Sequence, residues 1–408
     1  MVDSGDTAWM LTATAFVLFM TLPGLALFYG GLVRASSMIS IFMQCFMITC
    51  LTSIIWLICG YSLAFTDGGS ANPFIGGMSQ AFLMNVALDT EAGTIPETVF
   101  FMFQLTFAII APALIAGAYP ERVKFAACLT FSAIWLIIVY IPVCHWIWGG
   151  GWLAELGVMD FAGGIVIHTT AGISGLVFAW YLGPRHGFPS HVRPPHNPVL
   201  TGMGAAMLWV GWFGFNAGSA AAADASAGMA MVCTHLAAAS AAMTWTIVEM
   251  IEKKRPNSVG TVTGMVAGLA AVTPASGYVG PEGALVLGIS AGVLCEKMAH
   301  VVKDKWGIDD SLDVFAVHGV GGILGSVLVS VLAHPNVQGL GLAGHTMMYH
   351  LGVQCLAVAA VGLWSFIATW AILKLIDNCI IHIRVDEIEE AKGLDDVDHG
   401  EKAYDMKD

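Results

Sequence analysis

Long apolar stretches recur along the whole chain, and short connections between them carry most of the charged residues. Many of these stretches reach the ~20 residues that an α-helix needs to cross a bilayer. The pattern therefore predicts an all-α polytopic membrane protein with eleven transmembrane helices. The last stretch is too long for one crossing, so we expect its end to project into water. The predicted helices cover residues 8–33, 38–66, 96–118, 123–145, 161–182, 197–216, 226–250, 259–275, 283–302, 313–333 and 345–383.

Composition agrees with a membrane protein. Hydrophobic residues make up 57% and charged residues only 11% of the 408 residues, against about 25% charged residues in soluble domains. The mean hydropathy is +0.76. Nine cysteines are scattered without a C-x-x-C pair, which is typical of small core residues and not of disulfides or metal ligands. We expect no cofactor, no metal and no nucleic-acid partner.

The basic residues indicate the orientation. If the connections are numbered from the N-terminus, the even-numbered ones contain acidic residues such as Asp67, Glu155 and Glu282 but no lysine or arginine. Because basic connections stay in the cytosol, we predict an external N-terminus and a cytosolic C-terminus. The sixteen basic residues are Arg34, Arg122, Lys124, Arg185, Arg193, Lys253, Lys254, Arg255, Lys297, Lys303, Lys305, Lys374, Arg384, Lys392, Lys402 and Lys407.

The chain is thereby divided into a membrane domain, residues 1–383, and a polar, acidic cytosolic tail, residues 384–408. The first nine residues contain Asp3 and Asp6 but no basic segment. As they stand, they are not expected to form a signal peptide.

Two histidines lie in the fifth and tenth apolar stretches, where an ionisable side chain is costly. Each begins the pattern H-x-x-x-G-I-x-G, His168 first and His318 150 residues later. An aspartate precedes each of them, Asp160 and Asp313. Two ionisable groups in matching contexts suggest a duplicated transporter or channel with its site where the repeats meet.

The helix count predicts how these repeats are related. Residues 8–182 and 197–333 form two units of five helices, and helix 345–383 stands outside them. Because five is odd, the second unit is inverted relative to the first. His168 lies about seven residues from the outer end of its helix, roughly 10 Å deep at ~1.5 Å per residue. His318 lies about five residues from the inner end of its own. We therefore expect a 5+5 inverted repeat in which the two histidines meet near the bilayer midplane.

Other residues in the helices have structural interpretations. Gly264 and Gly268, like Gly288 and Gly292, have the small-x-x-x-small spacing of closely packed membrane helices. His235 and His350 lie outside the repeated pattern, and we expect them to be satisfied core residues.

Several segments together carry a family resemblance. They are Pro23-Gly24, Phe28-Tyr29-Gly30-Gly31, Trp148-Gly149-Gly150-Gly151, Asp160-Phe161-Ala162-Gly163-Gly164, Gly183-Pro184-Arg185, Gly211 to Ser219, Thr273-Pro274-Ala275, Asp313 to Gly319, Gly393-Leu394-Asp395, His399-Gly400-Glu401 and Ala403-Tyr404. In this combination the chain resembles the Amt/Mep/Rh family of ammonium transporters, and its bacterial Amt branch most closely. The resemblance implies a multi-pass protein of the plasma membrane, the inner membrane in bacteria, and not an enzyme.

The resemblance also implies an outer site that recruits ammonium, made by Trp148, Ser219 and Phe107. An indole face attracts a cation by roughly 0.5–2 kcal/mol, and a serine hydroxyl offers lone pairs to N–H donors. Without the family motifs, Trp148 would be interpreted as an interfacial tryptophan and Ser219 as a loop residue. Asp160 begins the fifth helix, so its role is to cap that helix, to lower the cost of a nearby cation, or both.

Below the recruitment site, the family implies a gate of Phe107 and Phe215, with Trp212 lining the same vestibule. His168 and His318 would then hydrogen-bond each other across a narrow, mostly apolar pore. Because burial disfavours the imidazolium form, we expect the pair to be largely neutral or to share one proton. Such a pore would recruit ammonium, deprotonate it and conduct ammonia, with or without a relayed proton. Potassium has no proton to release and would be excluded.

The family further implies a homotrimer in membrane lipid and a cytosolic PII signalling protein that binds the tail side. Two other functions stay open at this point. One is a membrane ammonium sensor of the same fold, although no kinase, cyclase or other output domain follows the helices. The other is a redox protein with haem held by His168 and His318 as axial ligands.

Overall fold

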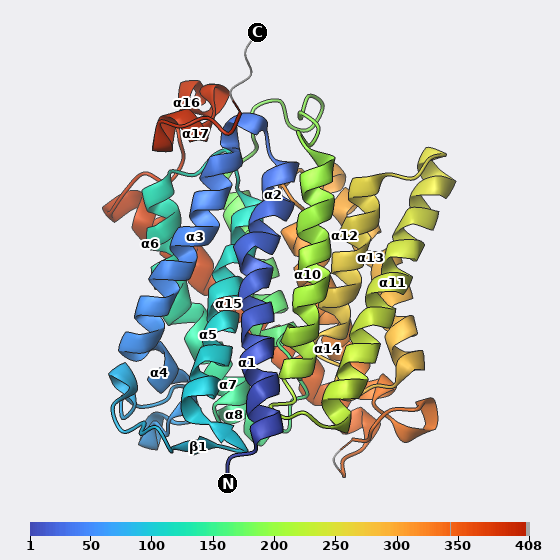
Figure 1. Cartoon of the computed structure of the whole chain (residues 1–408). Helices are drawn as coiled ribbons and strands as arrows, with labels where there is room; N and C mark the ends of the chain where they lie inside the picture. Colours follow the sequence, from blue (N-terminus) through green and yellow to red (C-terminus); the bar gives the residue numbers. More distant parts are fainter. Residues whose placement is uncertain (343, 405–408) are drawn as a thin grey trace.

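A computed structural model describes residues 1–342 and 344–404, and long helices run between the two ends of the bundle (Figure 1). The end of the predicted tail, residues 405–408 with Lys407, lies outside the described residues. All eleven predicted segments are helical, and among the described residues ten helical runs are long and apolar enough to cross a membrane. These runs are Ser4–Leu32, Ala35–Phe65, Glu97–Ala118, Phe125–Glu155, Gly164–Leu182, Pro198–Gly218, Ala225–Lys253, Pro281–Lys305, Phe315–Leu332 and Met347–Cys379.

Short π-helical and 3-10 turns divide several runs into separately labelled helices. A two-residue antiparallel hairpin, β1 (Glu91–Ala92) with β2 (Ile95–Pro96), precedes α5. The helices are α1 (Ser4–Phe19), α2 (Ala26–Leu32), α3 (Met38–Ile55), α4 (Tyr61–Phe65), α5 (Glu97–Ile115), α6 (Phe125–Trp135), α7 (Ile141–Trp148), α8 (Trp152–Glu155), α9 (Thr170–Leu182), α10 (Pro198–Gly218), α11 (Ala225–Lys253), α12 (Ser258–Val272), α13 (Pro281–His300), α14 (Val320–Leu332), α15 (Met347–Cys379), α16 (Glu387–Lys392) and α17 (Leu394–His399).

Polar residues define where many helices begin. In each case a side-chain oxygen accepts a backbone N–H group from the first turn, which satisfies a donor that the helix itself leaves unpaired. The capping residues of α1, α10, α11, α12 and α15 are Asp3, Asn197, Asp224, Asn257 and Thr346.

Helix α12 is shorter than the ten helical runs that are long enough to cross a membrane. Its 15 residues span about 22 Å at ~1.5 Å per residue, less than the ~30 Å hydrocarbon core of a bilayer. Its sequence is apolar, and most of its residues are buried. Helix α12 therefore lies inside the bundle and ends before reaching the full depth of its neighbours.

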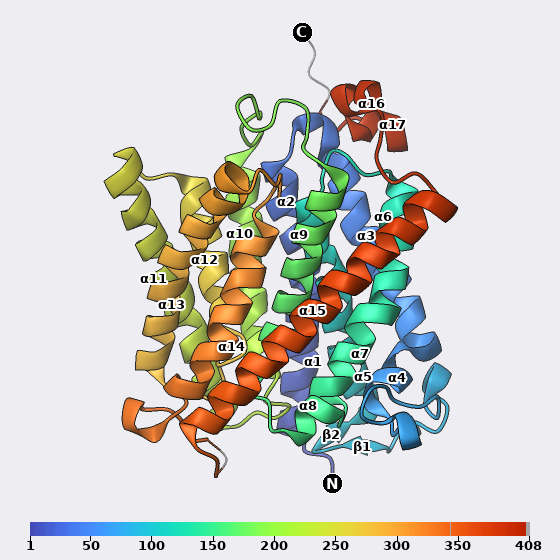
Figure 2. The ribbon, with the colours of Figure 1, turned by 180° about the vertical axis from the view of Figure 1, so that it is seen from behind.

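Helix α15 corrects one expectation. Its 33 residues run obliquely across the back of the bundle, as Figure 2 shows. Exposed apolar side chains such as Leu363, Ile367 and Leu375 continue along it. The tilt of α15 therefore takes up the length that exceeds one straight crossing, and the predicted projection into water is not needed.

The predicted glycine contacts are confirmed. A Cβ atom on Gly264 or Gly268 would collide with α11, and so would one on Gly288 or Gly292. Helices α12 and α13 therefore approach α11 closely because these positions lack side chains.

The N-terminus and the described part of the tail lie at opposite ends of the bundle, here called the N-end and the C-end (Figure 1). Helices α16 and α17 fold against the C-end. Leu394 is fully buried there, and Asp395 accepts the backbone N–H of Ser40 at 2.8 Å. The part of the tail that the structure describes is therefore packed onto the bundle.

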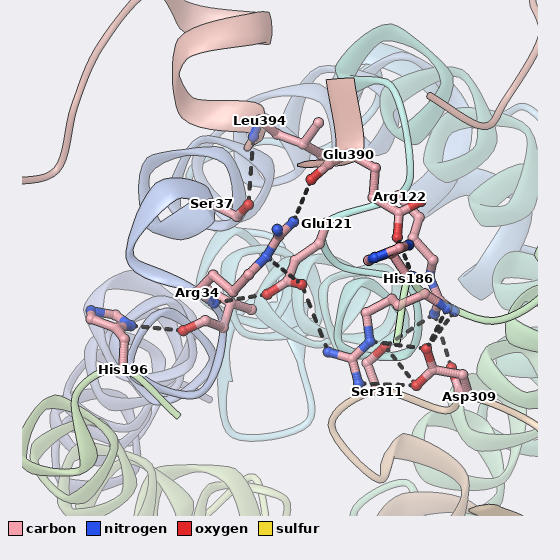
Figure 3. A network of polar contacts seen from close by, with 12 residues as sticks. Arg34, Ser37, Glu121, Arg122, His186, His196, Asp309, Ser311, Glu390 and Leu394 are labelled. Atoms are coloured by element: carbon pink, nitrogen blue, oxygen red, sulfur yellow. Dashed lines mark hydrogen bonds and ion pairs between the residues drawn. The ribbon is translucent and has the colours of Figure 1, made fainter. Parts of the chain in front are cut away.

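Charged side chains join the loops of the C-end into one network (Figure 3). Arg122 is fully buried. Its guanidinium donates to three backbone carbonyls, to Ser311 Oγ and to Asp309 Oδ2, the last at 3.0 Å. Arg185 also donates to both Asp309 carboxylate oxygens, at 2.9 and 3.0 Å. Asp309 therefore ties the connection before α10 to the connection after α13.

A second branch of the network reaches the tail. Arg34 donates to Glu121 Oε2 at 2.9 Å and to the backbone carbonyl of Glu390 at 2.7 Å. The Glu390 carboxylate accepts from Arg384 at 2.9 Å and from the backbone N–H of His186 at 2.7 Å. The tail is thus hydrogen-bonded to two connections of the C-end, the one that contains Arg34 and the one that contains His186.

The charge of Asp309 depends on its two arginines. Burial alone would raise the pKa of Asp309, but the positive charges of Arg122 and Arg185 outweigh it and hold this pKa below its usual range. Because the folded-state pKa lies below the unfolded value, the ion pairs stabilise the fold above about pH 4. That stabilisation is lost as the pH falls through the folded-state pKa.

Replacing Asp309 by Asn should lower the free energy of unfolding by about 3–5 kcal/mol at neutral pH, because Arg122 would keep its buried charge without a counter-charge. The variant should also lose less stability than the parent on acidification from about pH 5 to pH 2. Thermal unfolding in detergent measures both effects. Asp304→Asn is the control, since this nearby carboxylate is 64% exposed, and equal losses in the two variants would contradict the role of Asp309.

Candidate functional site

The two histidines of the repeated pattern are in direct contact inside the bundle. His168 Nδ1 lies 3.2 Å from His318 Nδ1, and the two rings are 5.2 Å apart with planes that differ by 17°. Only 1% of His168 and 3% of His318 is exposed. One ring therefore donates a hydrogen bond and the other accepts it, as a pair of neutral imidazoles can.

Both histidines lie in π-helical turns that precede regular helix. His168 belongs to the turn Gly164–Thr169 before α9, and His318 to the turn Phe315–Gly319 before α14. Single π-helical turns inside membrane helices are frequent at functional sites. The local backbone is therefore similar at both histidines, as the sequence pattern is.

A buried carboxylate supports the start of the first turn. The side chain of Asp160 accepts four successive backbone N–H groups, from Gly163 to Val166, at 2.6–3.1 Å. Asp160 is 4% exposed. These contacts of the carboxylate are those of a helix cap, one of the two roles that the sequence left open.

In the second repeat the counterpart of Asp160 is not Asp313, the aspartate that the sequence pattern paired with it. Asp310, and not Asp313, accepts the N–H groups that start the turn, those of Val314 and Phe315, at 3.1 and 2.7 Å. Asp313 instead pairs with Lys303 at 2.7 Å. Spacing could have identified the right residue, because Asp160 and Asp310 both stand eight positions before their histidine.

The first glycine of each pattern allows the two histidine helices to touch. A Cβ atom on Gly172 would collide with the backbone of Gly319, next to His318. A Cβ atom on Gly322 would lie 2.6 Å from the Gly164 carbonyl oxygen and 2.8 Å from His168 Cβ. The pattern H-x-x-x-G thus places a histidine beside the glycine of the opposite repeat.

Two aromatic side chains stand next to His168, and a third packs against one of them. Trp212 lies 5.5 Å from its ring with planes that differ by 21°, and Phe215 lies 6.0 Å away. Phe215 and Phe107 are packed at 4.4 Å between centroids, and both are buried. The predicted gate residues are therefore in contact with one another, and Phe215 joins them to the histidine pair.

A cavity of about 310 Å³ adjoins Phe107. Its lining includes Phe65 and Trp148, the last residues of α4 and α7, and these helix ends lie at the N-end of the bundle (Figure 1). Phe107, Trp148 and Ser219 all line it. The Trp148 ring meets Phe107 edge to face at 5.8 Å, and its indole N–H donates to the backbone carbonyl of Asp160 at 2.9 Å. Ser219 Oγ donates to the backbone carbonyl of Phe215 at 2.8 Å. Its lone pairs therefore stay available to an N–H donor.

His235 and His350, the two histidines outside the repeated pattern that were expected in the core, differ from each other. His350 is buried and contacts the carbonyl of Leu342 through Nε2 at 2.9 Å. The prediction for His235 is wrong: its side chain is exposed on α11 and packs beside Trp209, 5.2 Å between centroids. Which face of an apolar helix is buried depends on its neighbours, and the sequence around His235 does not specify them.

The haem interpretation does not fit this geometry. An iron held between two imidazoles needs its nitrogens about 4 Å apart, twice a metal–nitrogen bond of about 2 Å. The facing nitrogens here are 3.2 Å apart, and this contact leaves no room for a macrocycle between the rings.

Comparison with known proteins agrees with this arrangement. The model of the Ammonium Transporter Family matches residues 8–404. The chain belongs to the ammonium transporter family. It is accordingly a multi-pass membrane protein, and its family is one of transporters and not of enzymes.

Relatives of this family member cover nearly its whole length. It is 43% identical to an ammonium transporter of Bacillus subtilis over 99% of both chains. It is 41% identical to ammonium transporter Amt1 of Archaeoglobus fulgidus over 99% of this chain and 100% of the other.

Solved structures of this family have the same fold. Mep2 of Candida albicans aligns with a TM-score of 0.86 and 33% identity, over 95% of this chain and 87% of that one. A structure described as a sensor Amt protein aligns with a TM-score of 0.89 and 31% identity, over 97% and 98% of the two chains.

The crossing of the two histidine helices can be tested at neighbouring glycines of this family member. Gly322→Ala should lower the free energy of unfolding by about 1–3 kcal/mol, because the new methyl group overpacks the contact with His168. Gly321→Ala is the matched control, since its Cβ would stay 3.4 Å or more from its neighbours. Thermal unfolding and ammonium flux in liposomes measure the effects, and equal behaviour of the two variants would refute the close crossing.

Proposed function

We propose that the protein recruits ammonium at the cavity of Phe107, Trp148 and Ser219, deprotonates it, and conducts ammonia past His168 and His318. The proton follows separately or stays behind. The observation that carries this proposal is the direct Nδ1–Nδ1 contact of two buried imidazoles at 3.2 Å. An adjoining aromatic-lined cavity with a free hydroxyl acceptor supports it.

Recruitment follows from the chemistry of the cavity. The Trp148 and Phe107 rings offer faces that attract a cation within about 6 Å. The Ser219 oxygen accepts an N–H group, which potassium lacks. Asp160 adds a negative charge behind the cavity, although its oxygens are used in capping the turn before α9.

Passage beyond the cavity requires the Phe107 and Phe215 rings to move apart, since they are in contact and fully buried. A charged ion in this apolar interior costs several kcal/mol or more. A neutral ammonia molecule avoids that cost. The imidazole pair offers it one donor and one acceptor on the way, with Trp212 as a further wall of the same path.

We also propose the topology predicted from the sequence: eleven spans with α12 among them, an inverted 5+5 repeat, an external N-terminus and a cytosolic C-terminus. The N-terminus and the described tail helices α16 and α17 lie at opposite ends, which supports an odd number of spans (Figures 1 and 2). The matching Asp, π-helical turn, His and Gly positions support the duplication. In this topology residues 1–383 form the membrane domain, and the tail from residue 384 is cytosolic.

A homotrimer is part of the proposal, and His235 supports it. This polar side chain is exposed on α11, about ten residues from the start of the helix. A polar group on a surface that faces lipid is costly. Contact with a second subunit would remove it from lipid.

For the cytosolic face we propose a PII signalling protein as the partner. The described tail is packed across the C-end and bonded to its connections through Arg34 and Glu390. A partner that binds this face can therefore act on the tail and on the pore exit together.

Ammonium sensing is the second candidate function. It is favoured by the similarity to the structure described as a sensor Amt protein. Ammonium flux through purified protein in liposomes separates the two functions, since a sensor alone needs binding without conduction.

Replacing both His168 and His318 by Ala should abolish ammonium current, because the path loses its polar relay while the crossing glycines remain. Replacing one of them by Asp should instead admit water and let hydrated potassium pass. Both currents are measured in liposomes. Normal, selective ammonium current in the double alanine variant would refute the role of the histidines.

Trp148→Leu should weaken discrimination between ammonium and other cations by roughly twofold to thirtyfold, since the lost indole face is worth about 0.5–2 kcal/mol. Ser219→Ala should have a smaller effect, because a water molecule can replace one hydroxyl acceptor. Competition of sodium and potassium with ammonium uptake measures both. Unchanged discrimination in the Trp148 variant would remove this residue from the recruitment site.

Cutting the chain after Arg384 should leave a folded membrane domain with reduced or unregulated transport, since the contacts of Glu390, Leu394 and Asp395 are removed. Flux with and without a PII protein measures the effect. If the shortened chain transports and responds like the full chain, the tail has no regulatory role.

A further inference from the structure

Residues 273–275, with the sequence Thr-Pro-Ala, follow directly after the short helix α12 and belong to the motifs that carry the family resemblance. Thr273 and Ala275 are fully buried. The carbonyl of Pro274 accepts the backbone N–H of Phe161 at 3.1 Å, at the start of the segment that leads to His168. The chain therefore turns inside the bundle, beside the first histidine segment.

Two glycines leave room for this turn. A Cβ atom on Gly164 would collide with the Pro274 ring, and one on Gly325 would lie 2.8 Å from Pro274 Cγ. Gly164 precedes His168 in its π-helical turn, and Gly325 lies on α14 beyond His318. The turn is thus wedged between both histidine segments, and α12 ends early where this wedge begins.

The hydroxyl group of Thr273 has a fixed hydrogen-bond direction. Its Oγ1 donates its single proton to the Leu269 carbonyl at 2.8 Å. The same oxygen accepts the indole N–H of Trp212 at 2.9 Å. Because Trp212 is only 1% exposed, bulk water cannot take the place of Thr273 as the acceptor of the indole N–H.

Trp212 transmits this restraint to the histidine pair. Its ring lies 5.5 Å from the His168 ring, with planes that differ by 21°. Among the described residues, the imidazole of His168 has one hydrogen-bond partner, His318, and its buried Nε2 has none. The orientation of the His168 ring therefore depends on that one bond and on the side chains packed around it.

We propose that Thr273 is a positioning residue of the pore: it holds the Trp212 indole by its N–H group and thereby fixes the orientation of His168 toward His318. The inference rests on the proposed function of the histidine pair. It gives the end of α12 a role in selectivity, through an oxygen that touches neither the substrate nor a histidine.

The test compares Thr273→Val, which keeps the shape and removes the hydroxyl, with Thr273→Ser, which keeps it. The Trp212 indole N–H signal is recorded by NMR on protein labelled with ¹⁵N-tryptophan and assigned through Trp212→Phe. In the valine variant we expect a shifted, faster-exchanging Trp212 signal and an ammonium flux lower by about twofold to tenfold, as for one ordinary hydrogen bond. The serine variant should keep both values.

A double-mutant cycle measures the coupling between Thr273 and Trp212. Its Trp212→Phe arm also tests the proposal if the valine variant folds poorly. Trp212→Phe removes the donor and leaves Thr273 intact, so it should lower the flux in the same sense. Adding Thr273→Val to it should cause little further loss. Additive losses would overturn the proposal, and so would a valine variant with an unchanged Trp212 signal.

A changed Trp212 signal with normal flux would also overturn it, because the position of Trp212 would then not matter to transport. This outcome leaves the histidine mechanism standing. Failure of that mechanism is recognised separately, by ammonium current that persists after both histidines are replaced.

Discussion

The contact between the His168 and His318 rings depends on two helices that cross without side chains at the point of contact. Gly172 and Gly322 supply that space, each four residues after a histidine and each facing the other histidine segment. The π-helical turns and the carboxylates of Asp160 and Asp310 then set the start of each helix. Removing any of these features would separate the rings or turn them away from each other.

Other parts of the bundle hold the two histidine segments in place, one at the N-end and one at the C-end. At the N-end, Trp148 is bonded to the backbone of Asp160, so the wall of the cavity and the start of the first histidine segment are held together. At the C-end, Arg122 and Arg185 converge on Asp309, one residue before Asp310. The cap of the second histidine segment is therefore adjacent to the charge network that joins the loops and the tail. Displacement of the tail would therefore disturb a network that lies one residue from the cap of the second histidine segment.

Much of this arrangement is predictable from the chain because it depends on periodic or repeated features. Hydropathy predicts all eleven helical segments, and the duplicated H-x-x-x-G pattern identifies the two histidines. The second capping aspartate, Asp310, is also predictable, because its spacing to His318 equals that of Asp160 to His168. Two features depend on three-dimensional neighbours that no local pattern encodes. His235 lies on an apolar helix whose buried face is set by packing, and the length of α15 is taken up by a tilt across other helices. The role proposed for Thr273 likewise requires the position of Trp212 from another helix.

The proposed function requires that a neutral molecule, and not a cation, passes the histidine pair. The most direct measurement is transport by the unmodified protein in liposomes that are offered ammonium or potassium at the same ionic strength. Ammonium should be transported, whereas potassium without ammonium should produce neither uptake nor current, even in large excess. A potassium current through the unmodified protein would contradict the passage of a neutral molecule.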